Sequence, residues 1–315
     1  MTATDDLLDH TLLARHVTTI GERDRLYQRA RRHEITRVLK GCYVETAFWS
    51  ALKPDARHRA QAQLAALAFG ADLVFSHLTA VALWHLPMLG AWPTRVNVSG
   101  EPGSGVRATA TLRRHTLGID PAITEIDGLR VTSLAVTVAQ VAAAERFANG
   151  VVVADAALRR SIHPVLGLPS SVTAADLLEA ASMISASHGG VRSRSVVEFA
   201  DGRADRPGES MSRVSMHAAG LTMPQLQVVL FGASGTRYVV DFYWPTLRLI
   251  GEFDGKAKYE DPTFLRGRTP AQALADEKFR EDDLRAAGYS FRRWGWEVAL
   301  SAPRLAAHLR QAGVR

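Results

Sequence analysis

The sequence predicts an α+β protein of several domains, and three observations support this fold class. The chain has 315 residues, more than the roughly 100–200 residues of a single domain. Hydrophobic residues make up 47% and charged residues 22%, which excludes disordered, collagen-like and coiled-coil proteins. Stretches with helical and with strand-like periodicity follow one another between breaks rich in glycine and proline. We predict domains at residues 1–55, 56–165 and 201–315, with a connector at 166–200.

The first domain combines short helices with a β-hairpin. Leucines recur at helical spacing within residues 6–16, and a second, basic helix is expected over residues 22–32. Residues 35–44 alternate loosely around a tight turn at Lys40-Gly41, as the strands of a hairpin do. Helices followed by a hairpin are the layout of a winged helix-turn-helix, a DNA-binding fold.

The helix and hairpin of this domain are strongly basic. Seven basic side chains, which we expect to contact DNA phosphates, stand among only two acidic ones between residues 23 and 40. The basic residues are Arg23, Arg25, Arg29, Arg31, Arg32, Arg37 and Lys40. The whole chain carries a net charge of +6, which permits a double-stranded DNA partner without requiring one. A solvated basic face on a structural helix pair is the alternative, since high-GC genomes also enrich arginine.

The second domain is expected to be an α/β unit. Its predicted elements are a helix at 57–69, a helix capped by Ser76, strands at 94–99, 109–115 and 126–132, and helices at 133–145 and 150–161. His77 and His85 are eight residues apart, which does not suit a metal pair, and we interpret both as structural or surface residues. In the connector, a capped helix is expected over residues 173–184, and the Ser-, Gly- and Arg-rich residues 185–194 indicate a boundary.

The third domain has its elements in the order helix, three-stranded meander, helix, strand and closing helix. They are expected at residues 207–219, 225–231, 237–243, 247–253, 269–287, 289–294 and 302–311. Gly220 and Gly288 stand where the first and the long helix should end. We therefore predict an α/β core in which one sheet is covered by helices.

Acidic residues on the second and third of these strands form the sharpest candidate site. Glu252 and Asp254 share one face of a strand, with Lys256 following, and a short turn can bring Asp241 beside them. Three converging carboxylates would be unstable in a dry core without a cation, and their hard oxygens suit Mg²⁺ or Mn²⁺. We predict Asp241, Glu252 and Asp254 as metal ligands for phosphodiester hydrolysis, with Lys256 orienting the water or the phosphate.

Further side chains can join this site from neighbouring elements. Glu209 can supply a carboxylate from the first helix of the domain, and Gln227 lies on the first strand. On the long helix, Arg280 and Lys278 can contact phosphate, although solvated pairing of Lys278 with Asp282 is the simpler interpretation. For the carboxylates, the competing interpretation is a solvent-facing strand, with Glu209 an ordinary acid in the first turn of its helix.

These residues carry a resemblance to the PD-(D/E)xK nucleases, in particular to the branch similar to very-short-patch-repair endonucleases that is often found in actinobacterial proteins. The carriers are Glu209, the strand 239–245, the sequence Glu-Phe-Asp-Gly at 252–255 and the helix 277–282. The resemblance implies a restriction-endonuclease-like core with the catalytic residues Asp241, Glu252, Asp254, Lys256 and Glu209. The acid-x-Lys triplet of the family stands here either as Glu252-x-Asp254, with Lys256 two positions later, or as Asp254-x-Lys256 in the other register.

The first two domains resemble the antitoxins of the AbiE type IV toxin–antitoxin system. Residues 37–44 are similar to the wing of their winged-helix domain, and residues 76–87 and 128–133 are similar to segments of their second domain. The resemblance implies DNA binding and a cognate toxin protein as a partner.

Two functions stay open on this evidence. One is a DNA-binding protein with a Mg²⁺-dependent nuclease domain, and the other is a transcriptional regulator or antitoxin whose nuclease fold is inactive. A small-molecule enzyme is disfavoured because the sequence has no Gly-rich phosphate loop and no G-x-S-x-G motif. The single cysteine, Cys42, excludes an internal disulfide and a Cys-based metal site.

Location is also constrained by the sequence. No run of about 18 apolar residues exists, and no apolar stretch behind basic residues follows the acidic start at residues 1–6. We therefore expect a cytoplasmic protein with no membrane partner. The sequence does not set an oligomeric state.

Overall fold

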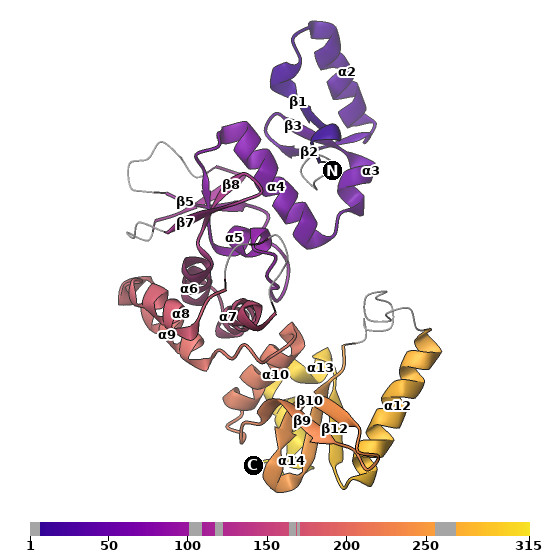
Figure 1. Cartoon of the computed structure of the whole chain (residues 1–315). Coiled ribbons are helices and arrows are strands. Elements are labelled where there is room, and N and C mark those ends of the chain that lie inside the picture. The colour runs from indigo at the N-terminus through magenta and orange to yellow at the C-terminus, as the bar shows by residue number, and fades with distance from the viewer. Residues whose placement is uncertain (1–6, 101–108, 117–121, 164–167, 169–170, 256–268) are drawn as a thin grey trace. The chain divides into compact units, whose positions relative to one another are not determined.

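The computed structural model describes residues 7–100, 109–116, 122–163, 168, 171–255 and 269–315 (Figure 1). The chain forms two compact units. The first contains residues 1–153 and 164–199, and the second contains residues 154–163 and 200–315. Each unit combines helices with β-sheet, so the predicted mixed α+β class is confirmed. None of the described helices is long and apolar enough to span a membrane.

A three-stranded antiparallel sheet begins the first unit. β1 (Thr11–Leu13) pairs with β3 (Cys42–Glu45), which also pairs with β2 (Ile35–Leu39). The helix expected over residues 6–16 is therefore wrong from residue 11 onward, because the backbone there pairs with β3 and then forms the 3-10 helix η1 (Ala14–His16). Pairing with a distant strand overrides the helical leucine spacing. The predicted hairpin turn is present, and Gly41 adopts φ +78° in it.

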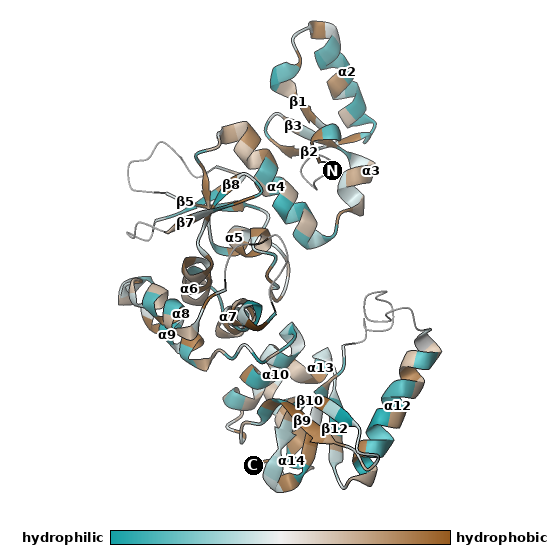
Figure 2. Ribbon diagram, in the orientation of Figure 1, coloured by the Kyte–Doolittle hydropathy of each residue, from teal (hydrophilic) through white to brown (hydrophobic). Residues whose placement is uncertain are grey.

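Helix α2 (Ile20–Arg31) packs against the rest of this part through few side chains. A capping box begins it: Thr19 accepts a hydrogen bond from the Glu22 amide, and the Glu22 carboxylate accepts one from the Thr19 amide. Of the α2 residues, Leu26 alone is buried, and it packs with Ile35 and Tyr43. Most of the α2 surface is therefore exposed, and Figure 2 shows that much of it is hydrophilic.

The middle of the first unit is a mixed five-stranded sheet of order β6-β5-β4-β8-β7. Its strands are β4 (Val74–Phe75), β5 (Val96–Ser99), β6 (Leu112–His115), β7 (Ile123–Ile126) and β8 (Leu129–Thr132). The helices that follow the first sheet are α3 (Thr46–Ala51), α4 (Pro54–Phe69), α5 (His77–Leu83), α6 (Leu134–Ala144) and α7 (Phe147–Ile162), and α7 belongs to the second unit from residue 154 onward. α4 and α5 pack on β5, and α5 also packs on β8 and α6.

Histidines contribute to the packing of this part, with His58 and His77 buried and His115 half-buried. The rings of His77 and His115 stack with their centroids 3.6 Å apart, and Nε2 of His115 lies 2.7 Å from Oδ1 of Asn97. His58 Nε2 lies 2.9 Å from the Thr79 hydroxyl. Burial lowers the pKa of His58 and of His115 to about 4, and lowers the pKa of His77 well below its usual value. These rings are neutral at pH 7, as packing groups of a core should be.

Residues 166–200 contain packed helices of the first unit. α8 (Ala174–Ser182) and α9 (Gly190–Phe199) both pack on α6. Leu177 of α8 and Val196 of α9 are fully buried. The glycines and serines that indicated a boundary here lie in and around these helices, so local composition does not mark the end of the unit.

The second unit contains a four-stranded sheet of order β12-β11-β10-β9. Its elements are α10 (Pro207–Ala218), β9 (Gln225–Phe231), β10 (Arg237–Trp244), η3 (Pro245–Leu247), β11 (Leu249–Phe253), α12 (Pro270–Ala286), β12 (Ser290–Trp294), α13 (Trp296–Ala299) and α14 (Ala302–Arg310). β9, β10 and β11 form an antiparallel meander, and β12 pairs in parallel with β11 after the α12 crossover. This is the element order that the sequence predicts.

Helices cover both faces of this sheet. Phe242 and Leu249 belong to the apolar cluster that contains Met216 of α10, whereas Ile250 belongs to the cluster that contains Leu284 of α12. Because Leu249 and Ile250 are neighbours on one strand, the two clusters lie on opposite faces. We call these the α10 face and the α12 face.

β9 and β10 both turn over at one point of the sheet. Val240 packs on the α12 face and Phe242 on the α10 face, although residues two apart on a regular strand share a face. On β9, Leu226 and Val228 change faces in the same way. The side chains between these pairs, Gln227 and Asp241, therefore lie where the sheet surface reverses.

Candidate functional site

The basic surface of α2 is exposed along its length. Arg23, Arg25 and Arg31 are all exposed, and within the part of the chain that the structure describes none of them makes an ion pair. Ile20 is 82% and Tyr27 57% exposed on the same helix. Apolar character would place both side chains against the core, whereas in the structure Leu26 occupies that position and these two point outward.

Two other arginines that are predicted to contact DNA lie close to acidic side chains. Nε of Arg29 donates to Oε2 of Glu34 at 3.3 Å, and its Nη2 lies 3.8 Å from Oε1 of Glu45. Arg32 lies 3.9 Å from Glu34 and is 72% exposed. Arg29 thus helps to fix the end of α2, whereas Arg32 stays open to a partner.

The β2–β3 hairpin carries two further exposed cations. Arg37 is at the middle of β2, and Lys40 is at the turn. Leu39 and Cys42 on either side of the turn are buried. Their burial anchors the hairpin, so the two cations project away from the sheet.

In the second unit, Glu209 and Asp241 meet at the side chain of Gln227. Nε2 of Gln227 donates to Oε2 of Glu209 at 3.1 Å and lies 3.5 Å from Oδ1 of Asp241. The backbone amide of Asp205 donates to the same Glu209 oxygen at 2.9 Å. The other Asp241 oxygen, Oδ2, accepts a hydrogen bond from the Phe253 amide at 3.1 Å. Helix α10 and strands β9, β10 and β11 all contribute to this group, which we call the carboxylate pair.

The backbone holds Gln227 in an unusual conformation at this point. Gln227 has φ +50° within β9, between the register pairs Val240–Val228 and Phe242–Leu226. A non-glycine residue in this region costs of order 1–3 kcal/mol and persists only where the surroundings enforce it. The strain places the Gln227 amide between two acidic side chains.

Burial changes the acidity of Glu209 in the carboxylate pair. Glu209 is only 4% exposed. Burial, reinforced by the nearby charge of Asp241, raises the pKa of Glu209 to about 8, while hydrogen bonds from Asp205 and Gln227 lower it. The buried Glu209 and the half-buried Asp241 therefore lie close enough that a proton or a cation would relieve their repulsion.

Glu252 lies apart from this pair, on the α12 face. Its Oε1 is 2.7 Å from Nη2 of Arg280 on α12, and its Oε2 is 3.1 Å from Nη2 of Arg293 on β12. Arg293 also pairs with Glu277 and Glu281 of α12. The structure thus places Glu252 in a network of ion pairs and separates it from Asp241.

Asp254 and Lys256 are the remaining residues of the predicted site. The Asp254 amide donates to the Trp294 carbonyl at 2.8 Å, and Oδ1 of Asp254 is buried with no hydrogen-bond partner among the described atoms. Lys256 lies outside the described residues. Across the described ranges, no group of three or more His, Cys, Asp or Glu side chains is placed to hold a metal ion. Of the predicted catalytic residues that the structure describes, Glu209 and Asp241 are the two brought together at Gln227.

The ion pairs of Glu252 had only a partial signal in the sequence. Arg280 was singled out as a phosphate contact, but Arg293 was not singled out at all. Its position opposite Glu252 follows from the parallel register of β11 and β12, which a single sequence does not reveal.

Comparison with known proteins gives relatives but no family. No family model matches the chain. The uncharacterized protein Rv2248 of Mycobacterium tuberculosis strain H37Rv and the uncharacterized protein MT2308 of strain CDC 1551 are each 30% identical to it over 170 residues. The match covers 54% of this chain and 59% of each relative, so the chain spans little more than half the length of the curated relatives it matches.

Proposed function

We propose that the protein binds double-stranded DNA through a winged helix-turn-helix built from η1, α2 and the β2–β3 hairpin. The observation that carries this proposal is the surface of α2. Arg23, Arg25 and Arg31 are exposed on it without ion pairs in the described part of the chain, and only Leu26 is buried. A helix with so little buried surface gains little from its own packing, which suits a helix that meets a partner.

The arrangement fits the docking geometry of this class of fold. In a helix-turn-helix the second helix enters the major groove, and its side chains reach base edges and phosphates. Here α2 follows η1 after only three residues, and the hairpin bearing Arg37 and Lys40 follows α2. In the proposal α2 is the recognition helix and the hairpin is the wing.

A salt series tests DNA binding directly. Binding of a labelled duplex is measured by fluorescence anisotropy at several salt concentrations. Each phosphate that the protein neutralises should contribute about −0.9 to the slope of log K against log salt. A clear negative slope supports the proposal, whereas no binding at low salt contradicts it.

We propose further that the second unit is a restriction-endonuclease-like domain that holds a divalent cation at the carboxylate pair. Mg²⁺ is usually bound by one or two carboxylates, with waters and substrate phosphates as the other ligands. Glu209 and Asp241 supply two such groups, and a cation would relieve the repulsion between the buried Glu209 and its neighbour Asp241. When bound, the ion would stabilise negative charge on a phosphodiester, while Gln227 keeps both carboxylates in place.

A second candidate function is a transcriptional regulator or antitoxin in which this domain does not cleave DNA. The ion pairs of Glu252 with Arg280 and Arg293 favour it, because a carboxylate held by two guanidinium groups is not free for a cation. As an antitoxin, the protein would also bind a cognate toxin protein.

Incubation with DNA separates the two functions. Supercoiled plasmid and linear DNA are incubated with the protein and Mg²⁺, Mn²⁺ or EDTA. Nicking that needs the metal and is abolished in Asp241→Asn, but not in the exposed control Asp282→Asn, supports the nuclease. DNA binding without nicking supports the regulator.

A further inference from the structure

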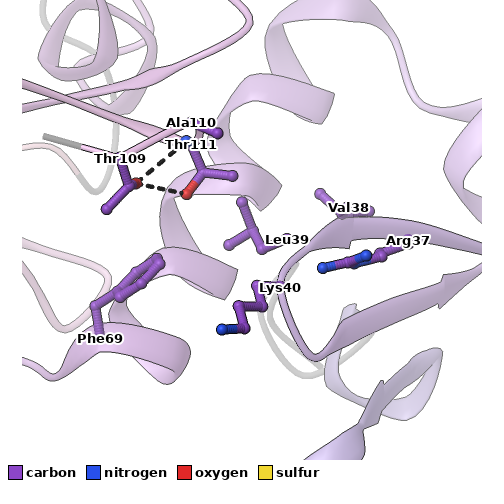
Figure 3. Close-up of a pocket in the computed structure, with 8 residues that line it drawn as sticks. All are labelled: Arg37, Val38, Leu39, Lys40, Phe69, Thr109, Ala110 and Thr111. Atoms are coloured by element: carbon purple, nitrogen blue, oxygen red, sulfur yellow. Dashed lines mark hydrogen bonds between the residues drawn. The ribbon is translucent and has the colours of Figure 1, made fainter.

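A pocket of the first unit lies at the turn of the β2–β3 hairpin. It has a volume of about 390 Å³ and is lined by the hairpin, the last residue of α4 and the segment just before β6, namely Arg37, Val38, Leu39, Lys40, Phe69 and residues 109–111 (Figure 3). This volume falls within the roughly 300–1,000 Å³ of small-molecule sites. Figure 3 shows Arg37 and Lys40 extending from the hairpin toward the space that the ring of Phe69 borders.

The pocket is positively charged. Two of its lining side chains, Arg37 and Lys40, are cations, and no lining residue is acidic. Neither cation forms an ion pair with any residue that the structure describes. An anion entering the pocket would therefore find two charges that the protein itself does not neutralise.

The opposite wall offers an aromatic ring. Phe69 ends α4 and is 43% exposed, so part of its ring has no protein packed on it. At the third wall, the Thr109 hydroxyl accepts hydrogen bonds from the amides of Thr111 and Leu112 and lies 3.0 Å from the Thr111 hydroxyl. These hydrogen bonds fix the segment before β6 and keep its hydroxyl groups beside the pocket.

Unpaired cations beside an exposed aromatic ring match the chemistry of a nucleotide. Lysine and arginine bind phosphate, and nucleobases stack on aromatic side chains in a sequence-tolerant way. We propose that this pocket binds one nucleotide, with its phosphate at Lys40 and Arg37 and its base against Phe69. The nucleotide can be free, or it can be an unpaired nucleotide of a DNA strand. The DNA form rests on the proposed function, whereas the free form does not.

Two probes distinguish these sources. The first is etheno-AMP, a fluorescent mononucleotide, and the second is a labelled duplex compared with the same duplex carrying a single-stranded tail. The variants are Phe69→Leu, which removes the ring but keeps an apolar side chain, and Lys40→Gln, which removes one charge. Phe231→Leu is the matched control, because Phe231 is an exposed phenylalanine of the second unit.

The free form predicts that etheno-AMP binds the wild-type protein and binds Phe69→Leu about tenfold more weakly, the loss expected for one stacked base. The DNA form predicts that the tailed duplex binds more tightly than the blunt one, and that Phe69→Leu and Lys40→Gln remove this advantage. The control should behave as the wild type in both assays.

The proposal is overturned if the wild-type protein does not bind etheno-AMP and binds the tailed duplex no more tightly than the blunt one. It is also overturned if both variants bind both probes as the wild type does. Failure of the proposed function has a different signature. In that case the blunt duplex does not bind at all, and the etheno-AMP measurement still decides on the pocket.

Discussion

Asp241 and Glu252 occupy opposed positions on β10 and β11, yet their side chains contact different groups. Phe242 pairs with Gly251, so Asp241 and Glu252 are the next positions along the two strands. Asp241 contacts Gln227 and, through it, Glu209 of α10, whereas Glu252 contacts Arg280 of α12. The carboxylates that could share a cation therefore come from α10 and β10, and not from one row along the third strand.

Cation binding should depend on the carboxylate pair and release protons. At pH 7 the raised pKa of Glu209 keeps it largely protonated, so Mn²⁺ should displace about one proton per ion. Calorimetric titration in two buffers of different ionisation enthalpy measures this number. Glu209→Gln and Asp241→Asn should abolish Mn²⁺ binding, whereas Glu252→Gln should leave it. The absence of both binding heat and a change in melting temperature with Mn²⁺ would contradict the cation site. The regulator would then be the function that remains.

Without a cation, Glu209 should make stability fall as pH rises. Its pKa is raised from 4.5 to about 8, so the stability due to its protonated form is complete below pH 4.5 and is lost as pH rises through 8. Glu209→Gln should therefore raise the free energy of unfolding at pH 8.5 by about 1–3 kcal/mol, the cost of a poorly solvated buried group. Urea unfolding at pH 5 and pH 8.5, with EDTA present, measures the change. An unaltered pH dependence in the variant would contradict the raised pKa.

The exposed arginines of α2 should carry DNA affinity. Replacing Arg23, Arg25 and Arg31 together with alanine should weaken binding and reduce the magnitude of the salt slope by about 0.9 for each phosphate that is no longer neutralised. Arg29→Ala is the matched control, since Glu34 and Glu45 already engage that side chain. Anisotropy with labelled duplex measures both quantities. Equal effects in the control and in the triple variant would place the interface elsewhere.

A buried ion pair should be the main polar support inside the second unit. Oδ2 of Asp155, on the part of α7 that belongs to this unit, lies 2.7 Å from Nη1 of Arg213 on α10, and both side chains are almost fully buried. Asp155→Ala removes the carboxylate that pairs with the buried Arg213 guanidinium and should cost about 3–5 kcal/mol of stability. Glu297→Ala, which breaks the exposed pair of Glu297 with Arg304, should change stability little. Chemical denaturation of both variants tests the difference.

The histidines of the middle sheet should destabilise the first unit in acid. The pKa of His115 is lowered from 6.5 to about 4, so its contribution is complete above pH 6.5 and is lost as pH falls toward 4. Between pH 7 and pH 5 this loss should be about 2 kcal/mol for one such group, and His115→Gln should remove it. Hydrogen exchange of the amides of β5 at both pH values reports local opening. The exposed His16→Gln should keep the wild-type pH dependence.

Some elements follow from local sequence rules and are found where those rules place them. The turn at Lys40-Gly41, the C-terminal glycines Gly220 and Gly288, and the start of α10 at Pro207 are local backbone preferences. The amphipathic elements of the second unit keep their predicted order for the same reason. In contrast, Thr11–Leu13 form a strand because β3, far along the chain, supplies their hydrogen bonds.

The sequence by itself determined the basic surface of the first unit and the identity of the acidic residues in the second, because charge and periodicity are properties of neighbouring residues. Only the tertiary structure decided which carboxylates meet. The reversal of β9 and β10 at Gln227 brings Asp241 to Glu209, and the parallel register of β12 brings Arg293 to Glu252. Strand alternation predicts faces only while a strand stays regular, and pairing across a sheet depends on the whole chain.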